Sequence, residues 1–118
     1  MADTYTQIFI QIVFAVQNRK CLIHPDWEED LYRKITGIVQ GKSHKMIAVN
    51  GMPDHIHIFI GYRPVDQMSE LVKVIKGETT RWIRENGYVQ GQFRWQEGYG
   101  AFSYSKTHVD RVYNYVMN

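Results

Sequence analysis

The chain has 118 residues, of which 44% are apolar and 22% are charged, and its formal net charge is only +2 at pH 7. These values are typical of one globular domain spanning residues 1–118, and the mild charge does not by itself indicate a nucleic-acid partner. A single cysteine, Cys21, excludes an internal disulfide framework and fits a reducing cytosol. The apolar N-terminal run has no basic segment before it and is too short to cross a bilayer, so we expect a cytoplasmic protein without a membrane partner.

The N-terminal part of the chain predicts a strand followed by an amphipathic helix. Residues 5–16 are rich in Ile, Val and Phe, which favour strands. Pro25 suits the first position of a helix and Gly41 suits its end, so a helix is expected over residues 25–40. Its apolar side chains recur at helical spacing, at Trp27, Leu31, Ile35, Ile38 and Val39.

The middle of the chain predicts a β-hairpin. Residues 45–52 and 55–62 both have the composition of strands. Residues 50–54 include the end of the first of these strands and the two residues that separate it from the second. They carry Asn-Gly and Pro-Asp pairs, which favour a tight turn. The two strands are therefore expected to pair directly in one sheet.

The second half of the chain predicts two helices separated by a loop. Asp66 is expected to cap a helix over residues 67–86. Residues 88–102 are rich in glycine and aromatic residues and are expected to form a loop with one or two short strands. Ser105 is expected to cap a last helix that continues to Asn118. The apolar stripe of the first of these helices consists of Met68, Leu71, Val72, Ile75, Trp82 and Ile83.

The predicted elements follow the order strand, helix, strand, strand, helix, strand, helix. This order is typical of an α+β sandwich of the ferredoxin-like (RRM-like) kind, in which helices cover a central antiparallel sheet. The last helix is an extra C-terminal element beyond that sandwich.

Two histidines, His55 and His57, alternate with isoleucines in the third predicted strand. A strand repeats every two residues, so both imidazoles point to one face while Ile56, Ile58 and Ile60 point to the other. Two imidazoles one pleat apart, about 7 Å between their Cα atoms, can converge on one metal ion or one phosphate. A bare His-x-His pattern is equally compatible with two exposed histidines on a solvated sheet face.

The last helix carries two tyrosines with different expected roles. On a helical wheel Val109, Val112, Tyr113 and Val116 gather on one side, which predicts that Tyr113 packs in the core. Tyr115 falls on the polar flank, from which a phenol can reach the face of a sheet. Taken alone, a tyrosine in that position is more often an ordinary surface residue.

Basic and aromatic side chains outside the apolar stripes are candidates for contacts with a nucleic acid. The basic residues could bind phosphates, although each is as compatible with solvated surface. The aromatic residues could stack on single-stranded bases, although most are expected to pin a loop to the core. The basic candidates are Arg19, Lys20, Lys42, Lys45, Lys73, Lys76, Arg81, Arg84 and Arg94. The aromatic candidates are Phe93, Trp95, Tyr99, Phe102 and Tyr104.

In this order, these motifs resemble the HUH endonuclease superfamily, whose signature is a His-hydrophobic-His motif. The similarity is to the one-tyrosine transposases of small bacterial insertion sequences that move as single strands, including their domesticated relatives at repetitive extragenic palindromes. It covers nearly the whole chain. It rests on Asn18-Arg19-Lys20, Met52-Pro53-Asp54-His55-Ile56-His57, Ile75-Lys76-Gly77 and residues 95–103 (WQEGYGAFS).

The resemblance implies an enzyme that cuts and rejoins single-stranded DNA. His55 and His57 would bind Mg²⁺ or Mn²⁺, and Tyr115 rather than Tyr113 would attack the DNA as the nucleophile and form a 5′-phosphotyrosine. A phenol is a weak nucleophile at neutral pH, so a divalent ion on the phosphate would lower the barrier. The family's usual third ligand is a glutamine four residues after the tyrosine, one position beyond Asn118; either the sequence is cut short or the ion is held differently.

The resemblance also implies partners. The DNA would be recognised through hairpins folded from single-stranded ends, and the protein would be a homodimer whose sheets join. A hydrophobic first strand at a sheet edge would be the joining surface, and the tyrosine helix would complete the site of its own subunit or of the partner.

Two alternatives remain open at this stage. One is a non-catalytic ferredoxin-like module that binds RNA or DNA without a divalent ion. The other is a replication-initiator nickase of the same superfamily, although such nickases usually have longer chains.

Overall fold

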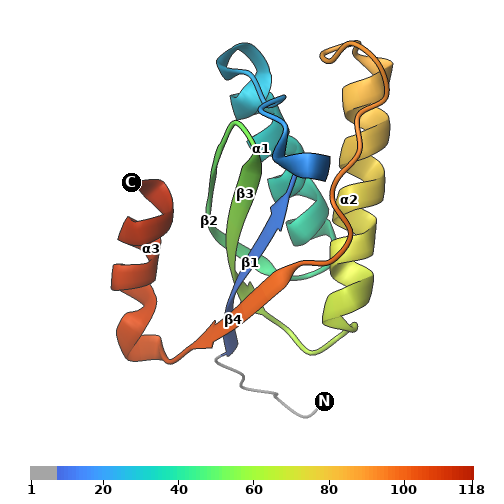
Figure 1. Cartoon of the computed structure of the whole chain (residues 1–118). Coiled ribbons are helices and arrows are strands. Elements are labelled where there is room, and N and C mark those ends of the chain that lie inside the picture. Colours follow the sequence, from blue (N-terminus) through green and yellow to red (C-terminus); the bar gives the residue numbers. More distant parts are fainter. Residues whose placement is uncertain (1–7) are drawn as a thin grey trace.

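Four antiparallel strands form the sheet at the centre of the protein, which we describe from a computed structural model over residues 8–118 (Figure 1). The strands are β1 (Ile8–Ala15), β2 (Lys45–Met52), β3 (His55–Tyr62) and β4 (Gly100–Tyr104). Their order across the sheet is β2-β3-β1-β4. The fold is therefore the predicted α+β arrangement, and the predicted start of the first strand at residues 5–7 lies outside the described residues.

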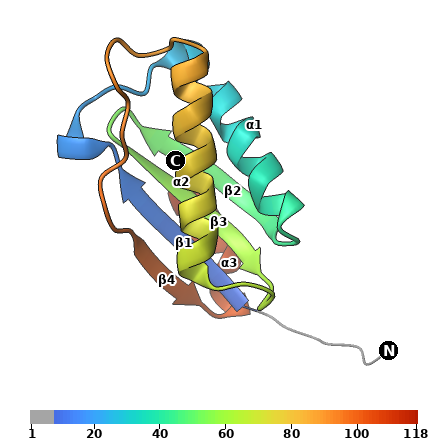
Figure 2. The same ribbon diagram turned by 90° about the vertical axis from the view of Figure 1, so that its right-hand side faces the viewer.

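Three helices cover the two faces of this sheet. Helices α1 (Pro25–Gly41) and α2 (Met68–Glu85) lie on one face, and α3 (Val109–Met117) lies on the other (Figures 1 and 2). Two short 3-10 helices, η1 (Gln17–Arg19) and η2 (Lys106–His108), follow β1 and precede α3. Within residues 8–118, no helix is both long and apolar enough to cross a membrane.

The main core lies between the sheet and the pair α1–α2. Ile56, Ile58 and Ile60 are fully buried there, as the alternation in β3 predicts. All five apolar residues predicted for α1 are buried, together with Tyr32. Burial of the Tyr32 phenol, with Glu28 nearby, raises its pKa to about 12.

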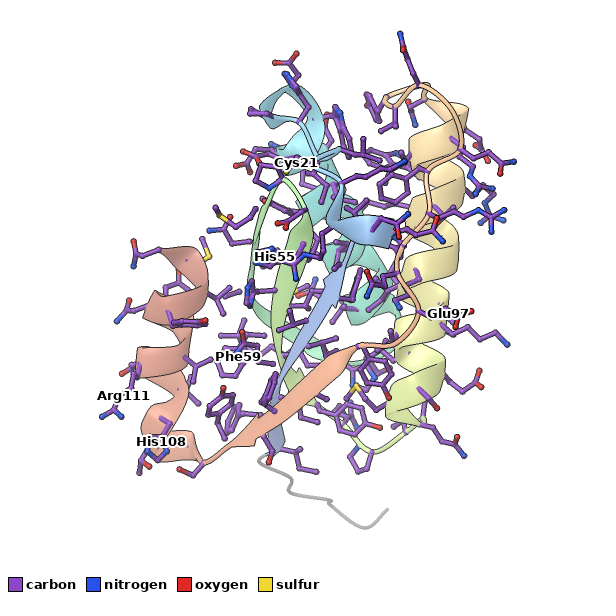
Figure 3. The ribbon with its side chains drawn as sticks, in the orientation of Figure 1. Cys21, His55, Phe59, Glu97, His108 and Arg111 are labelled. Atoms are coloured by element: carbon purple, nitrogen blue, oxygen red, sulfur yellow. The ribbon has the colours of Figure 1, made fainter. Side chains whose placement is uncertain are left out.

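A second, smaller core fixes α3 to the opposite face. Val112 and Val116 are buried against Ala48 and Phe59. Figure 3 shows Phe59 between the sheet and α3. The prediction that Tyr113 packs here is wrong, because 41% of its surface is exposed. In a helix of only nine residues, the contact is satisfied by the valines one turn apart.

The position of β1 contradicts one expectation. We expected the hydrophobic first strand at a sheet edge, but β1 pairs with β3 on one side and with β4 on the other. Its apolar composition is explained by this internal place, where Ile12 and Phe14 are buried. In the loop before β4, an isolated bridge between Val16 and Trp95 extends the pairing, so short strand pairing near residues 88–102 is confirmed.

Two predicted helix caps are also wrong. Helix α2 begins after Gln67, and the Asp66 carboxylate instead accepts a hydrogen bond from the buried His44 ring, 3.0 Å away. Ser105 precedes η2 rather than α3, and its hydroxyl contacts His108 Nδ1 at 2.7 Å. In both cases a nearby histidine competes for the oxygen that a cap would use.

The loop that leads to β4 depends on one buried hydrogen bond. Trp95 Nε1 donates to Thr79 Oγ1 of α2 at 2.9 Å, and the Thr79 hydroxyl donates to the Ile75 carbonyl. We expect Thr79→Val, which keeps the shape but removes the acceptor, to lower the free energy of unfolding by about 1–3 kcal/mol. Urea denaturation measures this, with the neighbouring Thr80→Val as the control. Equal stability of the two variants would contradict the role of this bond.

Candidate active site

The two histidines of β3 lie side by side on the sheet face that α3 covers. His57 is paired across the sheet with Val13 of β1 and Asn50 of β2, and His55 with Ala15 and Met52. The centroids of the two imidazole rings are 4.9 Å apart. The strand bounds 45–52 and 55–62 are as predicted, so the turn between them comprises Pro53 and Asp54, and His55 is the first residue of β3.

Each imidazole is oriented by a hydrogen bond to its Nδ1 atom. His55 Nδ1 lies 2.7 Å from Asp54 Oδ1, and His57 Nδ1 lies 2.7 Å from Gln11 Oε1. A carboxylate and an amide oxygen can only accept, so both rings donate their Nδ1–H and leave Nε2 with its lone pair. This is the arrangement by which proteins prepare histidines to bind a metal ion.

The electrostatics of the site favour a neutral His57 and a charged Asp54. Burial lowers the pKa of His57, and the neighbouring His55 lowers it further. The hydrogen bond from His55 lowers the pKa of Asp54, assisted by the Arg19 guanidinium at 2.9 Å. Asp54 therefore joins Arg19 to His55 while remaining a carboxylate at neutral pH.

Tyr115 approaches the histidines from α3. Its ring centroid is 5.9 Å from that of His57, with the rings nearly perpendicular, and 66% of its surface is exposed. The end of α3 is held by Asn50, whose Nδ2 donates to the carbonyls of Val116 and Met117 at 3.1 and 3.2 Å. Asn50 is also the cross-strand neighbour of His57, so one side chain ties the tyrosine helix to the histidine strand.

The three predicted site residues border one cavity of about 430 Å³, which we call the site cavity. His55, His57 and Tyr115 all line it, and Arg19 and Tyr99 complete part of its wall. The structure therefore brings together the side chains that the sequence placed at one site. A polar opening of this kind, with oriented imidazoles and an exposed phenol, is suited to a phosphate-containing ligand.

The donor set fits a loosely held divalent ion rather than a closed structural site. Within residues 8–118, no three His, Cys, Asp or Glu side chains gather closely enough to hold a metal ion. Two imidazoles would leave several coordination positions for substrate oxygens and water. The Asn118 side chain lies along its own helix, where its Nδ2 donates to the Asn114 carbonyl at 2.9 Å.

Several of the basic candidates are engaged within the protein. Arg84 donates two hydrogen bonds to the Phe93 carbonyl, and Lys76 donates to the carbonyls of Gln96 and Gly98. Burial lowers the pKa of Lys76. Arg81 lies 3.8 Å from Glu85. These side chains hold the loop before β4 or neutralise an acidic neighbour, which leaves fewer charges for a ligand.

The other basic candidates remain exposed. Lys73 and Arg94 line, with Lys76, a groove of about 570 Å³ between α2 and the loop before β4, which we call the basic groove. Lys20 is exposed just after η1 and does not line this groove. Lys42 directly follows α1, and Lys45 is the first residue of β2. The structure thus places the basic residues in separate regions rather than in one patch.

The aromatic candidates divide into two groups. Phe93 and Trp95 are buried in the main core, and Tyr104 packs against Phe59. Tyr99 and Phe102 are 39% and 52% exposed. Of the five aromatic candidates, these two have the exposed surface that stacking on a base would need.

Three residues of the site were not predicted from the sequence. Gln11, Asp54 and Asn50 orient His57, His55 and α3, respectively. A polar glutamine within an otherwise apolar strand was a signal for the first. The other two depend on the turn geometry and on the docking of α3, which local patterns do not reveal.

The fold and the site define an α+β sandwich that carries a histidine pair and a facing tyrosine on its sheet. The chain belongs to the family described as Transposase IS200 like, whose profile matches residues 4–118. The resemblance stated from the motifs is thereby confirmed at the level of the family. No curated protein matches the chain in sequence.

Two solved structures are similar to this one in fold. One is a candidate transposase from Deinococcus radiodurans R1, with 18% identity, a TM-score of 0.76, and coverage of 100% of this chain and 95% of that one. The other is a REP-associated tyrosine transposase bound to a REP hairpin, with 14% identity, a TM-score of 0.68, and coverage of 98% and 70%. At these identities the likeness shows the fold alone.

The pKa of His57 gives a prediction about pH. In the unfolded chain His57 has the ordinary histidine pKa of 6.5, whereas burial lowers its pKa in the folded protein. The stability that His57 contributes should therefore be present above pH 6.5 and be lost as the pH falls through the folded pKa. NMR titration of metal-free protein should give a midpoint below 6.5. A midpoint at or above 6.5 would contradict the burial that we describe.

Proposed function

We propose that this protein is a metal-dependent transesterase that cleaves and rejoins single-stranded DNA during transposition or a domesticated form of it. The observation that carries this proposal is the convergence of His55, His57 and Tyr115 on the site cavity. Membership of the IS200-like transposase family supports DNA as the substrate.

In the proposed reaction Tyr115 Oη attacks the phosphorus of a DNA phosphodiester. A bond forms between Oη and phosphorus, and the bond between phosphorus and the 3′ oxygen of the preceding nucleotide breaks. The phenol loses its proton to solvent, and the departing 3′ oxygen takes up a proton to become a hydroxyl. The 5′-phosphotyrosine bond stores the energy of the broken phosphodiester for the rejoining step, so no nucleotide cofactor is needed.

His55 and His57 would hold Mg²⁺ or Mn²⁺ through their Nε2 atoms. When bound, such an ion would neutralise charge on the phosphate oxygens and lower the barrier to attack. Asp54 and Gln11 keep both rings in the tautomer that leaves Nε2 unprotonated. Asn50 holds the end of α3, which limits the positions that the Tyr115 ring can take.

The DNA partner is proposed to contain hairpins near the cleaved strand. One protein of similar fold was solved bound to a REP hairpin, which supports this class of ligand. Lys73 and Arg94 in the basic groove are the best placed of the candidates to contact phosphates. Arg19 lines the site cavity, where its Nε already donates to Asp54 while the exposed remainder of its guanidinium would face a phosphate. Three other candidates would bind a DNA phosphate only after giving up their contacts within the protein. They are Lys76, Arg81 and Arg84.

A homodimer is also part of the proposal. The outer strands of the sheet over residues 8–118 are β2 and β4, so β1 cannot be the strand that joins two sheets. A strand at an edge presents unpaired backbone groups to a second chain. Of the two outer strands, β4 has the larger share of exposed residues, which favours it as the joining edge.

The experiment uses single-stranded DNA from both flanks of the gene, with its hairpins intact and one end labelled, incubated with Mn²⁺. We expect a protein–DNA adduct that survives denaturation and disappears in Tyr115→Phe or after chelation of the ion. The variant Tyr113→Phe is the matched control, because that phenol lies on the same helix and is exposed away from the site cavity.

The outcomes separate the proposal from its alternatives. An adduct lost in Tyr113→Phe but kept in Tyr115→Phe would overturn the assigned nucleophile. Hairpin binding without any adduct, and without dependence on the ion, would indicate a non-catalytic binding module. Cleavage of plasmid origin sequences in preference to the flanking hairpins would indicate a replication-initiator nickase.

A further inference from the structure

A second cavity, of about 600 Å³, lies beside the site cavity, and we call it the side cavity. It lies between α3 and the part of the sheet formed by β1 and β4. His57 and Tyr115 line both cavities. If the phosphate of a ligand lies at Tyr115 in the site cavity, the part of the ligand next to that phosphate can therefore reach the side cavity.

The walls of the side cavity are apolar and include an exposed aromatic ring. Val13 and Val112 line it from the sheet and from α3, and Phe102 lines it from β4 with 52% of its surface exposed. Phe102 is not part of either core cluster, so packing within the monomer does not explain the ring. An exposed aromatic beside a phosphate-binding site is the usual platform on which a single-stranded base stacks.

Gly100 shapes the same cavity. It lies across from Val13, in the row of the sheet that continues to His57. A Cβ atom at position 100 would lie 3.1 Å from the Phe102 ring. The absence of a side chain at Gly100 therefore leaves the space that the Phe102 ring occupies. A larger residue would displace the ring and narrow the space beside Tyr115.

Polar atoms at the floor of the cavity connect it to the histidine pair. Gln11 Nε2 donates to the Tyr104 hydroxyl at 3.1 Å, while Gln11 Oε1 accepts from His57 Nδ1. The Tyr104 hydroxyl, which accepts that bond, can still donate its proton to a ligand. Arg111 lines the rim and carries a positive charge suited to a phosphate. Figure 3 shows Arg111 on the outer side of α3.

We propose that the side cavity binds one unstacked nucleobase of the nucleotide next to the phosphate that Tyr115 attacks. This rests on the proposed function, and it adds a specificity site to it. The base would stack on Phe102 and present an acceptor to the Tyr104 hydroxyl, and the adjoining backbone phosphate would lie near Arg111. A base that cannot fill the cavity would leave its phosphate poorly placed at Tyr115, so the cleaved position would depend on that base.

Photo-cross-linking tests this occupant directly. Flanking DNA strands would each carry 5-iodouracil at one position, scanned along the strand, with chelator present so that the strand stays intact. After irradiation, mass spectrometry identifies the attached residue. We expect attachment within residues 100–104 from a base on one side of the cleaved phosphate. Phe102→Ala should lower the yield about tenfold, and Phe102→Trp should retain it.

Val65→Ala is the matched control, because Val65 is an exposed apolar residue far along the chain from the cavity and should leave the yield unchanged. Adduct formation with Mn²⁺, measured on the same strands, reports the proposed function separately. Adduct formation with cross-links only outside residues 100–104, or with a yield insensitive to Phe102→Ala, would overturn the base site and leave the function standing. Cross-linking at residues 100–104 without any adduct would overturn the function and the placement of the base beside a cleaved phosphate.

Discussion

Helix α3 reaches the sheet through an apolar contact in which Val112 and Val116 lie against Ala48 and Phe59. The position of Tyr115 in the candidate site depends on this contact, which together with the Asn50 hydrogen bonds holds the last helix against the strand that carries the histidines. Burying a valine contributes about 1.5–3 kcal/mol, enough to hold a short helix that would not persist alone in water. Asn50 then fixes the rotation and the end of the helix.

Strand β3 serves both cores because its side chains alternate. Ile56, Ile58 and Ile60 fill the space under α1 and α2, whereas His57 and Phe59 face α3. The two histidines are therefore carried by an interior strand of the sheet over residues 8–118. Such a support fixes the imidazoles more firmly than a loop would. Tyr115 comes from the other side of the site, on α3, and 66% of its surface is exposed.

The sequence indicated these features where the pattern was local. Alternation in β3 located the histidines on the face away from the isoleucines, and helical spacing separated Tyr115 from the apolar stripe of α3. Local sequence patterns did not reveal which strands pair with one another across the sheet. An apolar strand such as β1 has the same composition at an edge or in the interior, and only the pairing of β4 beside it decides the difference. The roles of Gln11 and Asp54 depend on the same tertiary contacts.

The proposed mechanism requires that one divalent ion bind between His55 and His57, within reach of Tyr115. A crystal structure of the full chain soaked with Mn²⁺, with anomalous diffraction recorded for manganese, tests this most directly. We expect a single strong anomalous peak in contact with Nε2 of both imidazoles, and the Tyr115 hydroxyl facing it. A peak bound elsewhere, or a Tyr115 ring directed away from an occupied histidine pair in every subunit, would contradict it.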